Sequence, residues 1–208
     1  MNEQGNEDEK INKKKIVVIG DSNVGKTSII LRYTRGFYEE NYCTTIGTGF
    51  FLKMLPEYGE NKGFKIWDTA GQERYRSVVP MYCRESNAII IVFDVTSSKA
   101  DECIEIWIKF ARDNVDGNIP IYIVGNKCDL ICENDGTILK LNKLMEKYDY
   151  PLSIIHYPLF YVSAKSDTGI DQLFHQIAEQ LFDHCNEFES IPQIIENMDF
   201  NETREKCC

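Results

Sequence analysis

Short runs of apolar residues recur along the chain from residue 15 onward, and most of them are bounded by Gly, Asp or Asn. The runs are rich in β-branched and aromatic residues, which favours buried strands over helices. The predicted strands cover residues 16–19, 50–55, 64–67, 89–93, 121–124 and 159–162. The turn-prone stretch from Tyr58 to Gly63 indicates that the second and third strands pair as an antiparallel hairpin.

Between these runs the apolar residues follow helical spacing. It predicts helices over residues 26–34, 101–114, 138–148 and 170–185. In the second helix one apolar stripe at i, i+3, i+4 spacing consists of Cys103, Ile106, Trp107, Phe110 and Ala111. Alternating strands and helices predict an α/β fold with a six-stranded, mostly parallel sheet, one antiparallel edge strand and helices on both faces. Ligands of such sheets bind beyond the carboxyl ends of the strands.

Length and charge narrow the possibilities further. The chain has 208 residues, enough for one domain with extensions. We expect a polar extension over residues 1–14, the domain over 15–185, and a tail over 186–208 that holds six acidic and two basic residues. The net charge of −10 argues against general nucleic-acid binding through a basic surface.

Eight cysteines raise the alternative of a disulfide-stapled secreted protein. Six of them are scattered singly, and the first 15 residues contain no apolar signal-peptide core. The longest apolar run, residues 88–93, is far shorter than the ~20 residues that cross a bilayer. We therefore expect reduced thiols, a cytosolic protein and no membrane-spanning segment.

A phosphate-binding loop motif follows the first predicted strand. The stretch from Gly20 to Thr27 reads GDSNVGKT and opens a helix, which is the context that the motif requires. Its glycines allow successive N–H groups to face one phosphate, Lys26 reaches the β- and γ-phosphates, and Thr27 offers a hydroxyl to Mg²⁺. The expected nucleotide contacts in this loop are Asp21, Ser22, Asn23, Val24, Gly25, Lys26, Thr27 and Ser28. The alternative is a glycine-rich turn that binds nothing.

Two further motifs point to guanine. Asn126, Lys127 and Asp129 follow the fifth predicted strand, while Ser163-Ala164-Lys165 follows the sixth. The carboxylate of Asp129 can accept hydrogen bonds from both the N1–H and the exocyclic amine of guanine, a donor pair that adenine lacks. Taken alone, the first motif is also a plausible loop at the end of a strand.

The stretch WDTAGQE, residues 67–73, resembles the corresponding motif of the Ras-like small GTPases. The resemblance implies that Asp68 holds Mg²⁺ through water, that the N–H of Gly71 faces the γ-phosphate, and that Gln72 orients the attacking water. It also implies that Thr45 completes the Mg²⁺ shell and that Tyr38 packs against the guanine edge. For Tyr38, an exposed loop aromatic is the alternative.

Within that superfamily the chain is similar to the Rabs. The resemblance rests on the TIG stretch at 45–47 followed by Phe50, the stretch 67–76, the run 80–82 and the paired cysteines. It covers residues 15–130 closely and 159–182 more loosely, and the long segment 131–161 has no assigned role. Phe50, Trp67 and Tyr82 match the aromatic trio that Rabs present to effectors, with core packing as the alternative.

Smaller features of the resemblance favour an endosomal subgroup. Gly49 occupies a position where many Rabs carry an acidic residue and an endosomal subgroup carries a small one. Residues 73–82 also resemble the endosomal subgroup. The pair Cys207 and Cys208 resembles the double lipidation signal of Rabs and implies a membrane anchor of two lipids. Two surface cysteines without lipid are the alternative.

Together these motifs predict a Rab-like GTPase that switches between GTP and GDP in vesicle trafficking and cycles between cytosol and intracellular membranes. Lys26 and Gln72 are the expected catalytic residues, with Mg²⁺ as cofactor. The expected partners are an exchange factor, a GTPase-activating protein (GAP), a GDP-dissociation inhibitor (GDI) and effectors, with a monomeric GTPase domain. The rivals are a GTP-binding scaffold without turnover and a P-loop ATPase or kinase. Asn126 and Asp129 disfavour the latter.

Overall fold

A computed structural model of the chain describes residues 12–40, 45, 47–72, 77–115, 117–131, 136–146 and 157–182. Its described residues form a six-stranded sheet with the strand order β2-β3-β1-β4-β5-β6. The strands are β1 (Lys13–Ile19), β2 (Thr48–Met54), β3 (Gly63–Thr69), β4 (Ala88–Asp94), β5 (Ile121–Asn126) and β6 (Leu159–Tyr161). Strand β2 runs antiparallel to β3, and the other pairs are parallel. The predicted α/β fold is therefore confirmed, including its antiparallel edge strand.

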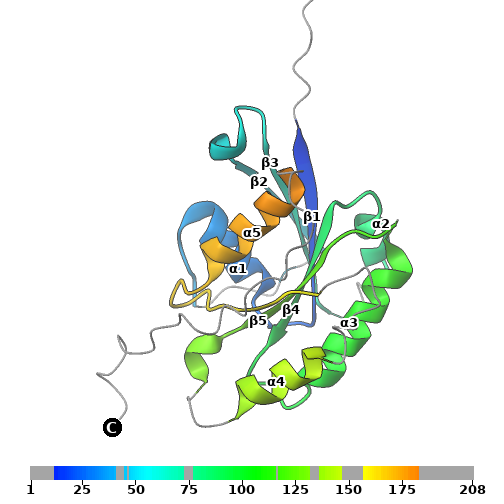
Figure 1. The fold of residues 1–208 in the computed structure, drawn as a ribbon, viewed down its shortest axis with the longest axis vertical. Helices are drawn as coiled ribbons and strands as arrows, with labels where there is room; N and C mark the ends of the chain where they lie inside the picture. The colour runs from blue at the N-terminus through cyan, green and yellow to red at the C-terminus, as the bar shows by residue number, and fades with distance from the viewer. Residues whose placement is uncertain are drawn as a thin grey trace, which may run out of the picture.

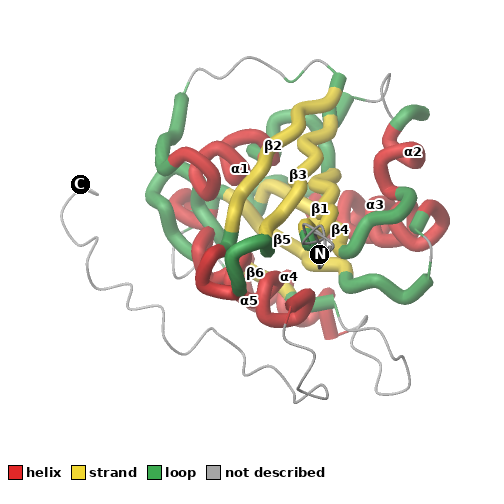
Figure 2. The backbone as a smooth tube through the Cα atoms, turned by 90° about the horizontal axis from the view of Figure 1, so that it is seen from above, coloured by secondary structure: helices red, strands yellow, loops and turns green. Residues whose placement is uncertain are grey.

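Helices cover both faces of the sheet. They are α1 (Lys26–Arg35), α2 (Val79–Cys83), α3 (Ala100–Asn114), α4 (Thr137–Glu146) and α5 (Ile170–Phe182), with short 3₁₀ turns η1 (Pro56–Tyr58) and η3 (Cys128–Leu130). Figure 1 shows how the elements surround the sheet, and Figure 2 shows α1 and α5 on one side of it with α2 and α3 on the other. Among the described residues, no helix is both long and apolar enough to span a bilayer.

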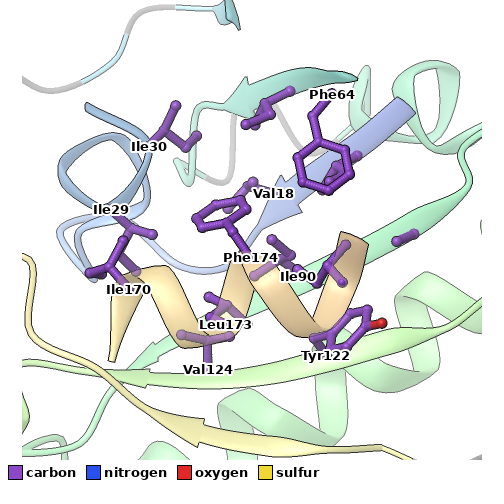
Figure 3. Close-up of a cluster of buried hydrophobic side chains, with 14 of the residues drawn as sticks. Val18, Ile29, Ile30, Phe64, Ile90, Tyr122, Val124, Ile170, Leu173 and Phe174 are labelled. Atoms are coloured by element: carbon purple, nitrogen blue, oxygen red, sulfur yellow. The ribbon is translucent and has the colours of Figure 1, made fainter. Parts of the chain in front are cut away.

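The core consists of two layers because successive strand residues point to opposite faces of the sheet. Val18 lies with α1 and α5 in one layer, whereas Val17 lies with α2 and α3 in the other. Figure 3 shows the first layer, in which Phe174 of α5 and Ile29 of α1 approach the strands. Each fully buried side chain of this size contributes about 1.5–3 kcal/mol to folding. The two layers thus fix the sheet between its helices.

The structure also departs from the predicted elements. Strand β1 begins at Lys13 rather than residue 16, because Lys13–Lys15 pair with Gly63–Lys65 of β3. Helix α2 has no counterpart among the predicted helices, since five residues are too few to display a helical period. The predicted helix ends at 147–148 and 183–185 lie outside the described residues.

The parallel strands all deliver their carboxyl ends to one edge of the sheet. Gly20 follows β1, Asp68 lies near the end of β3, Asp94 ends β4, Asn126 ends β5 and Ser163 lies just beyond β6. All of the predicted nucleotide motifs except Tyr38 and Thr45 thus begin within or directly after a parallel strand. The fold brings motifs far apart in sequence to one place.

Candidate guanine-nucleotide site

The loop between β1 and α1 has a backbone that depends on glycine at two positions. Gly20 and Gly25 have positive φ angles of 143° and 92°. A Cβ at Gly20 would overlap the carbonyl oxygen of Val92, and a Cβ at Gly25 would overlap the side-chain amide of Asn126. Asn23 has a φ of 63°, a conformation that Asn tolerates better than most residues. The loop therefore packs tightly against β4 and the end of β5.

Lys26 is a nearly buried cation at the first turn of α1. Its Nζ donates to the carbonyl oxygens of Gly20 at 2.9 Å and Asp21 at 2.6 Å. Burial lowers the pKa of this ammonium to about 8, an effect that the nearby charges of Asp68 and Asp21 oppose. An anionic phosphate beside Nζ would raise that pKa again. The ammonium is thus placed to gain from a bound phosphate.

Oxygen atoms converge beside Lys26. Thr27 Oγ1 donates to Asp68 Oδ2 at 2.6 Å and lies 2.7 Å from Thr45 Oγ1. Asp68 Oδ1 is buried and has no hydrogen-bond partner among the residues that the structure describes. Burial raises the pKa of the Asp68 carboxyl, against the stabilising effects of Thr27, Lys26 and Thr45. A cation at this point would relieve that desolvation, and an all-oxygen donor set fits Mg²⁺.

The donor set also differs from that of a protein-caged metal. No cluster of three or more His, Cys, Asp or Glu side chains with metal-binding geometry occurs within the part of the chain that the structure describes. Two hydroxyls and one carboxylate would leave coordination positions to water and phosphate, which is the usual way in which Mg²⁺ binds. The residues present therefore fit the ion that the sequence predicts.

At the other end of the site, Asn126 joins three loops. Its Nδ2 donates to the carbonyl of Val24 at 2.8 Å, and its Oδ1 accepts from the N–H of Ala164 at 3.2 Å. Ser163 is fully buried and donates from Oγ to Asp129 Oδ1 at 2.6 Å. These bonds orient the Asp129 carboxylate and tie it to the phosphate loop through the loop after β6.

Two residues outside the predicted motifs complete this arrangement. Arg32 of α1 donates to the carbonyls of Ala164 at 3.0 Å and Lys165 at 3.2 Å. Asp94 accepts from Lys127 Nζ at 2.6 Å, which lowers the pKa of the Asp94 carboxyl despite its partial burial. Neither residue stands in a recognisable motif. The only signal in the sequence is position, because Asp94 follows a predicted strand at the carboxyl edge of the sheet and Arg32 lies on the first predicted helix.

One cavity of about 360 Å³ collects most of the predicted nucleotide contacts. Those in its lining are Ser22, Asn23, Gly25, Lys26, Thr27, Ser28, Tyr38, Thr45, Gly71, Asn126, Lys127, Asp129, Ser163, Ala164 and Lys165. Asp68 lies beneath Thr27, Val24 is buried, and the side chain of Asp21 points to α3. Gln72 follows the lining residue Gly71 and is half-buried.

The predicted effector trio forms one contiguous surface. The rings of Phe50 and Trp67 meet edge-on with centroids 5.3 Å apart, and Trp67 and Tyr82 are also 5.3 Å apart. Phe50 is 54% exposed, whereas Trp67 and Tyr82 pack partly against the α2 and α3 side of the core. The trio therefore combines an exposed ring with two rings that the core supports. The predicted lipidation residues Cys207 and Cys208 lie outside the described residues.

Comparison with known proteins identifies the family. The model of the Ras family matches residues 15–183. Human Rab-22A is 38% identical over 169 residues, which are 80% of this chain and 82% of that protein. Mouse Rab-21 is 36% identical over 81% of this chain and 73% of its own length, and dog Rab-13 is 33% identical over 80% and 79%. The chain belongs to the Ras family and, within it, to the Rab small GTPases, which bind GTP and GDP, hydrolyse GTP and act as switches in vesicle trafficking.

Proposed function

We propose that the cavity at the carboxyl edge of the sheet is the site where this Rab protein binds guanine nucleotide with Mg²⁺ and hydrolyses GTP. One observation carries the proposal: the same cavity is lined by Lys26 at one end and by Asp129 at the other. An ammonium for phosphate and a carboxylate for guanine are therefore present together. The oxygen cluster of Thr27, Thr45 and Asp68 lies at the phosphate end.

At that end, each group has a defined task. The N–H groups of the loop and the start of α1 attract phosphate oxygens, and Lys26 exchanges its two loop carbonyls for the β- and γ-phosphates. Thr27, Thr45 and Asp68 would hold Mg²⁺, directly or through water. When bound, this ion neutralises negative charge on the phosphate oxygens. Gly71 lies against the Asp21 carbonyl and Lys26 Nζ, where a larger residue would collide.

Hydrolysis is an in-line attack of water on the γ-phosphorus. A bond forms from the water oxygen to phosphorus while the bond to the β–γ bridging oxygen breaks, and the water proton leaves with phosphate. Gln72 orients the water, and Lys26 stabilises charge that builds up on the oxygens. Loss of the γ-phosphate then frees Thr45 and Gly71, so that the segments that carry them relax. This change of shape is the signal.

The first experiment identifies the ligand. Purified protein is denatured, the released nucleotide is separated by chromatography, and phosphate release is then followed with GTP and with ATP. We expect GDP or GTP in the released fraction and phosphate release from GTP alone. ATP hydrolysis would support a P-loop ATPase, and GTP binding without any phosphate release would support a scaffold.

Thr27→Asn is expected to weaken GTP binding far more than GDP binding. The Thr27 hydroxyl is the centre of the oxygen cluster, with partners at 2.6 and 2.7 Å. Mg²⁺ held at this cluster would lose the Thr27 hydroxyl in this variant, and a triphosphate, which carries more negative charge than a diphosphate, would lose more affinity. Titration of fluorescent GDP and GTP analogues with and without excess Mg²⁺ measures the effect. Equal losses for both nucleotides would mean that Thr27 only supports the loop.

We propose that partner proteins distinguish the GTP-bound from the GDP-bound state through the surface formed by Phe50, Trp67 and Tyr82. The exposed ring of Phe50 stands on β2, the edge strand of the sheet, which begins three residues after Thr45. Effectors, an exchange factor, a GAP and a GDI are the partner classes that a Rab uses. The trio offers an apolar contact surface of the kind that protein partners bury.

We further propose that Cys207 and Cys208 each carry a lipid and hold the protein on endosomal membranes. One chain gives marginal, reversible binding, whereas two anchor a domain stably. The acidic tail should not add electrostatic attraction. An N-terminally tagged chain is expected on endosomal markers, and Cys207→Ser with Cys208→Ser should be cytosolic with unchanged GTP affinity. Mass spectrometry of the tail peptide checks the modification. A membrane-bound double variant would refute the anchor.

A further inference from the structure

The carboxylate of Asp21, the second residue of the phosphate loop, points away from the nucleotide cavity. Its Oδ1 accepts from the indole Nε1–H of Trp107 at 2.9 Å, and its Oδ2 accepts from the thiol of Cys103 at 2.7 Å. Both donors lie on α3, one helical turn apart. Asp21 and Cys103 line a second cavity of about 190 Å³ rather than the nucleotide cavity. The side chain is thus held on the far side of the loop.

The backbone of Asp21, in contrast, belongs to the phosphate end of the site. Lys26 Nζ donates to its carbonyl oxygen at 2.6 Å, and a Cβ at Gly71 would overlap that same carbonyl. Lys26 and Gly71 are the residues placed beside the γ-phosphate above. The loop therefore carries a negative side chain next to the point where the most negative part of the ligand binds. If this carboxylate could turn freely, it would repel the phosphates.

The two donors are suited to restrain it. Trp107 is 4% exposed and packs in the core between α3 and the sheet, so its N–H has a fixed direction. Burial and the bond to Asp21 raise the pKa of the Cys103 thiol to about 12. The thiol therefore stays protonated at neutral pH and remains a donor rather than a second negative charge.

We propose that Trp107 and Cys103 are positioning residues for nucleotide binding, which act by holding the Asp21 carboxylate against α3 and away from the phosphates. The proposal rests on the proposed function of the cavity. The ligand is the guanine nucleotide already assigned. Helix α3 controls where the charge of the phosphate loop lies relative to that nucleotide. The effect should be larger for GTP than for GDP, because the γ-phosphate adds charge at the end nearest Asp21.

The test removes each donor in turn. Trp107→Phe deletes the N–H, Cys103→Ala deletes the thiol, and Cys103→Ser keeps an O–H donor as the matched control. Affinities and dissociation rates of fluorescent GDP and GTP analogues are measured at saturating Mg²⁺. We expect Trp107→Phe and Cys103→Ala to weaken GTP binding on the order of tenfold and GDP binding less. Cys103→Ser should bind as the parent does, because its O–H replaces the thiol as donor to Asp21.

Repeating the variants in an Asp21→Ala background separates charge from packing. Without the carboxylate, Trp107→Phe and Cys103→Ala should change GTP affinity by less than about twofold relative to Asp21→Ala itself. The unfolding temperature should fall more in the parent than in the Asp21→Ala background, because only the parent loses a hydrogen bond to Asp21, and the fall that remains in the Asp21→Ala background reports packing. Unchanged GTP affinity in the parent background, or equal losses in both, would overturn the proposal. If Trp107→Phe does not fold, the Cys103 pair decides alone. A parent that binds no guanine nucleotide refutes the proposed function instead.

Discussion

Asp129→Asn is expected to move the preference of the protein from GTP toward XTP. In the parent, Asp129 can accept from both the N1–H and the amine of guanine, while Ser163 fixes its orientation at 2.6 Å. An amide accepts at one atom and donates at the other, which matches the N1–H and the C2 carbonyl of xanthine. The loss for GTP should be about 2–4 kcal/mol, or roughly 30-fold to 1000-fold in affinity. Competition of GTP and XTP against a fluorescent nucleotide measures the switch.

Ser163→Ala is the matched control for this switch. It removes the donor that orients the carboxylate but leaves the carboxylate itself. Affinity for GTP should fall without any gain for XTP, since the pattern of acceptors is unchanged. Should Asp129→Asn leave the ratio of GTP to XTP affinity as in the parent, Asp129 does not recognise the base.

The apolar pattern predicts a strand correctly where the strand is buried on both faces of the sheet. The run from Ile16 to Ile19 is continuously apolar because helices cover both sides of β1, and burial of every residue there agrees with the pattern. The apolar pattern does not place Lys13–Lys15 in this strand, because the backbone pairing of β1 with β3 continues beyond the buried part of β1. Helix α2 was missed because its five residues hold only two buried positions, Val79 and Cys83.

The candidate site divides in the same way between local and distant contacts. The phosphate loop and the motif around Asn126 could be predicted because each is a short stretch whose residue types and spacing carry the chemistry. The contribution of Arg32 to the site could not be predicted, since Arg32 donates a hydrogen bond to the carbonyl of Ala164, a residue 132 positions away. The direction of the Asp21 side chain could not be predicted either, because Trp107, which donates a hydrogen bond to it, lies 86 positions along the chain. Motifs indicate which groups are present, and the packing of helices decides where they point.

Gln72→Leu is expected to abolish most of the stimulation of GTP hydrolysis by an activating partner. Hydrolysis by the protein alone should be slow, because residues 39–44 contain no arginine that could reach the phosphates from within the chain. A partner's arginine can raise the rate by ~10³- to 10⁵-fold, provided that the attacking water is oriented. Leu has about the volume of Gln but can neither donate nor accept a hydrogen bond. The variant should therefore retain nucleotide affinity and lose the acceleration.

Single-turnover phosphate release, with and without purified GAP domains that act on Rab proteins, measures both parts of this prediction. The parent alone should take minutes to an hour per turnover, in the range of intrinsic small-GTPase rates. Gln72→Leu should be slower still and should respond to none of the domains that accelerate the parent. Equal affinities of both proteins for a non-hydrolysable GTP analogue would confirm that binding is intact. Turnover of several per second by the parent alone would contradict the need for a partner, and a variant that responds like the parent would remove Gln72 from catalysis.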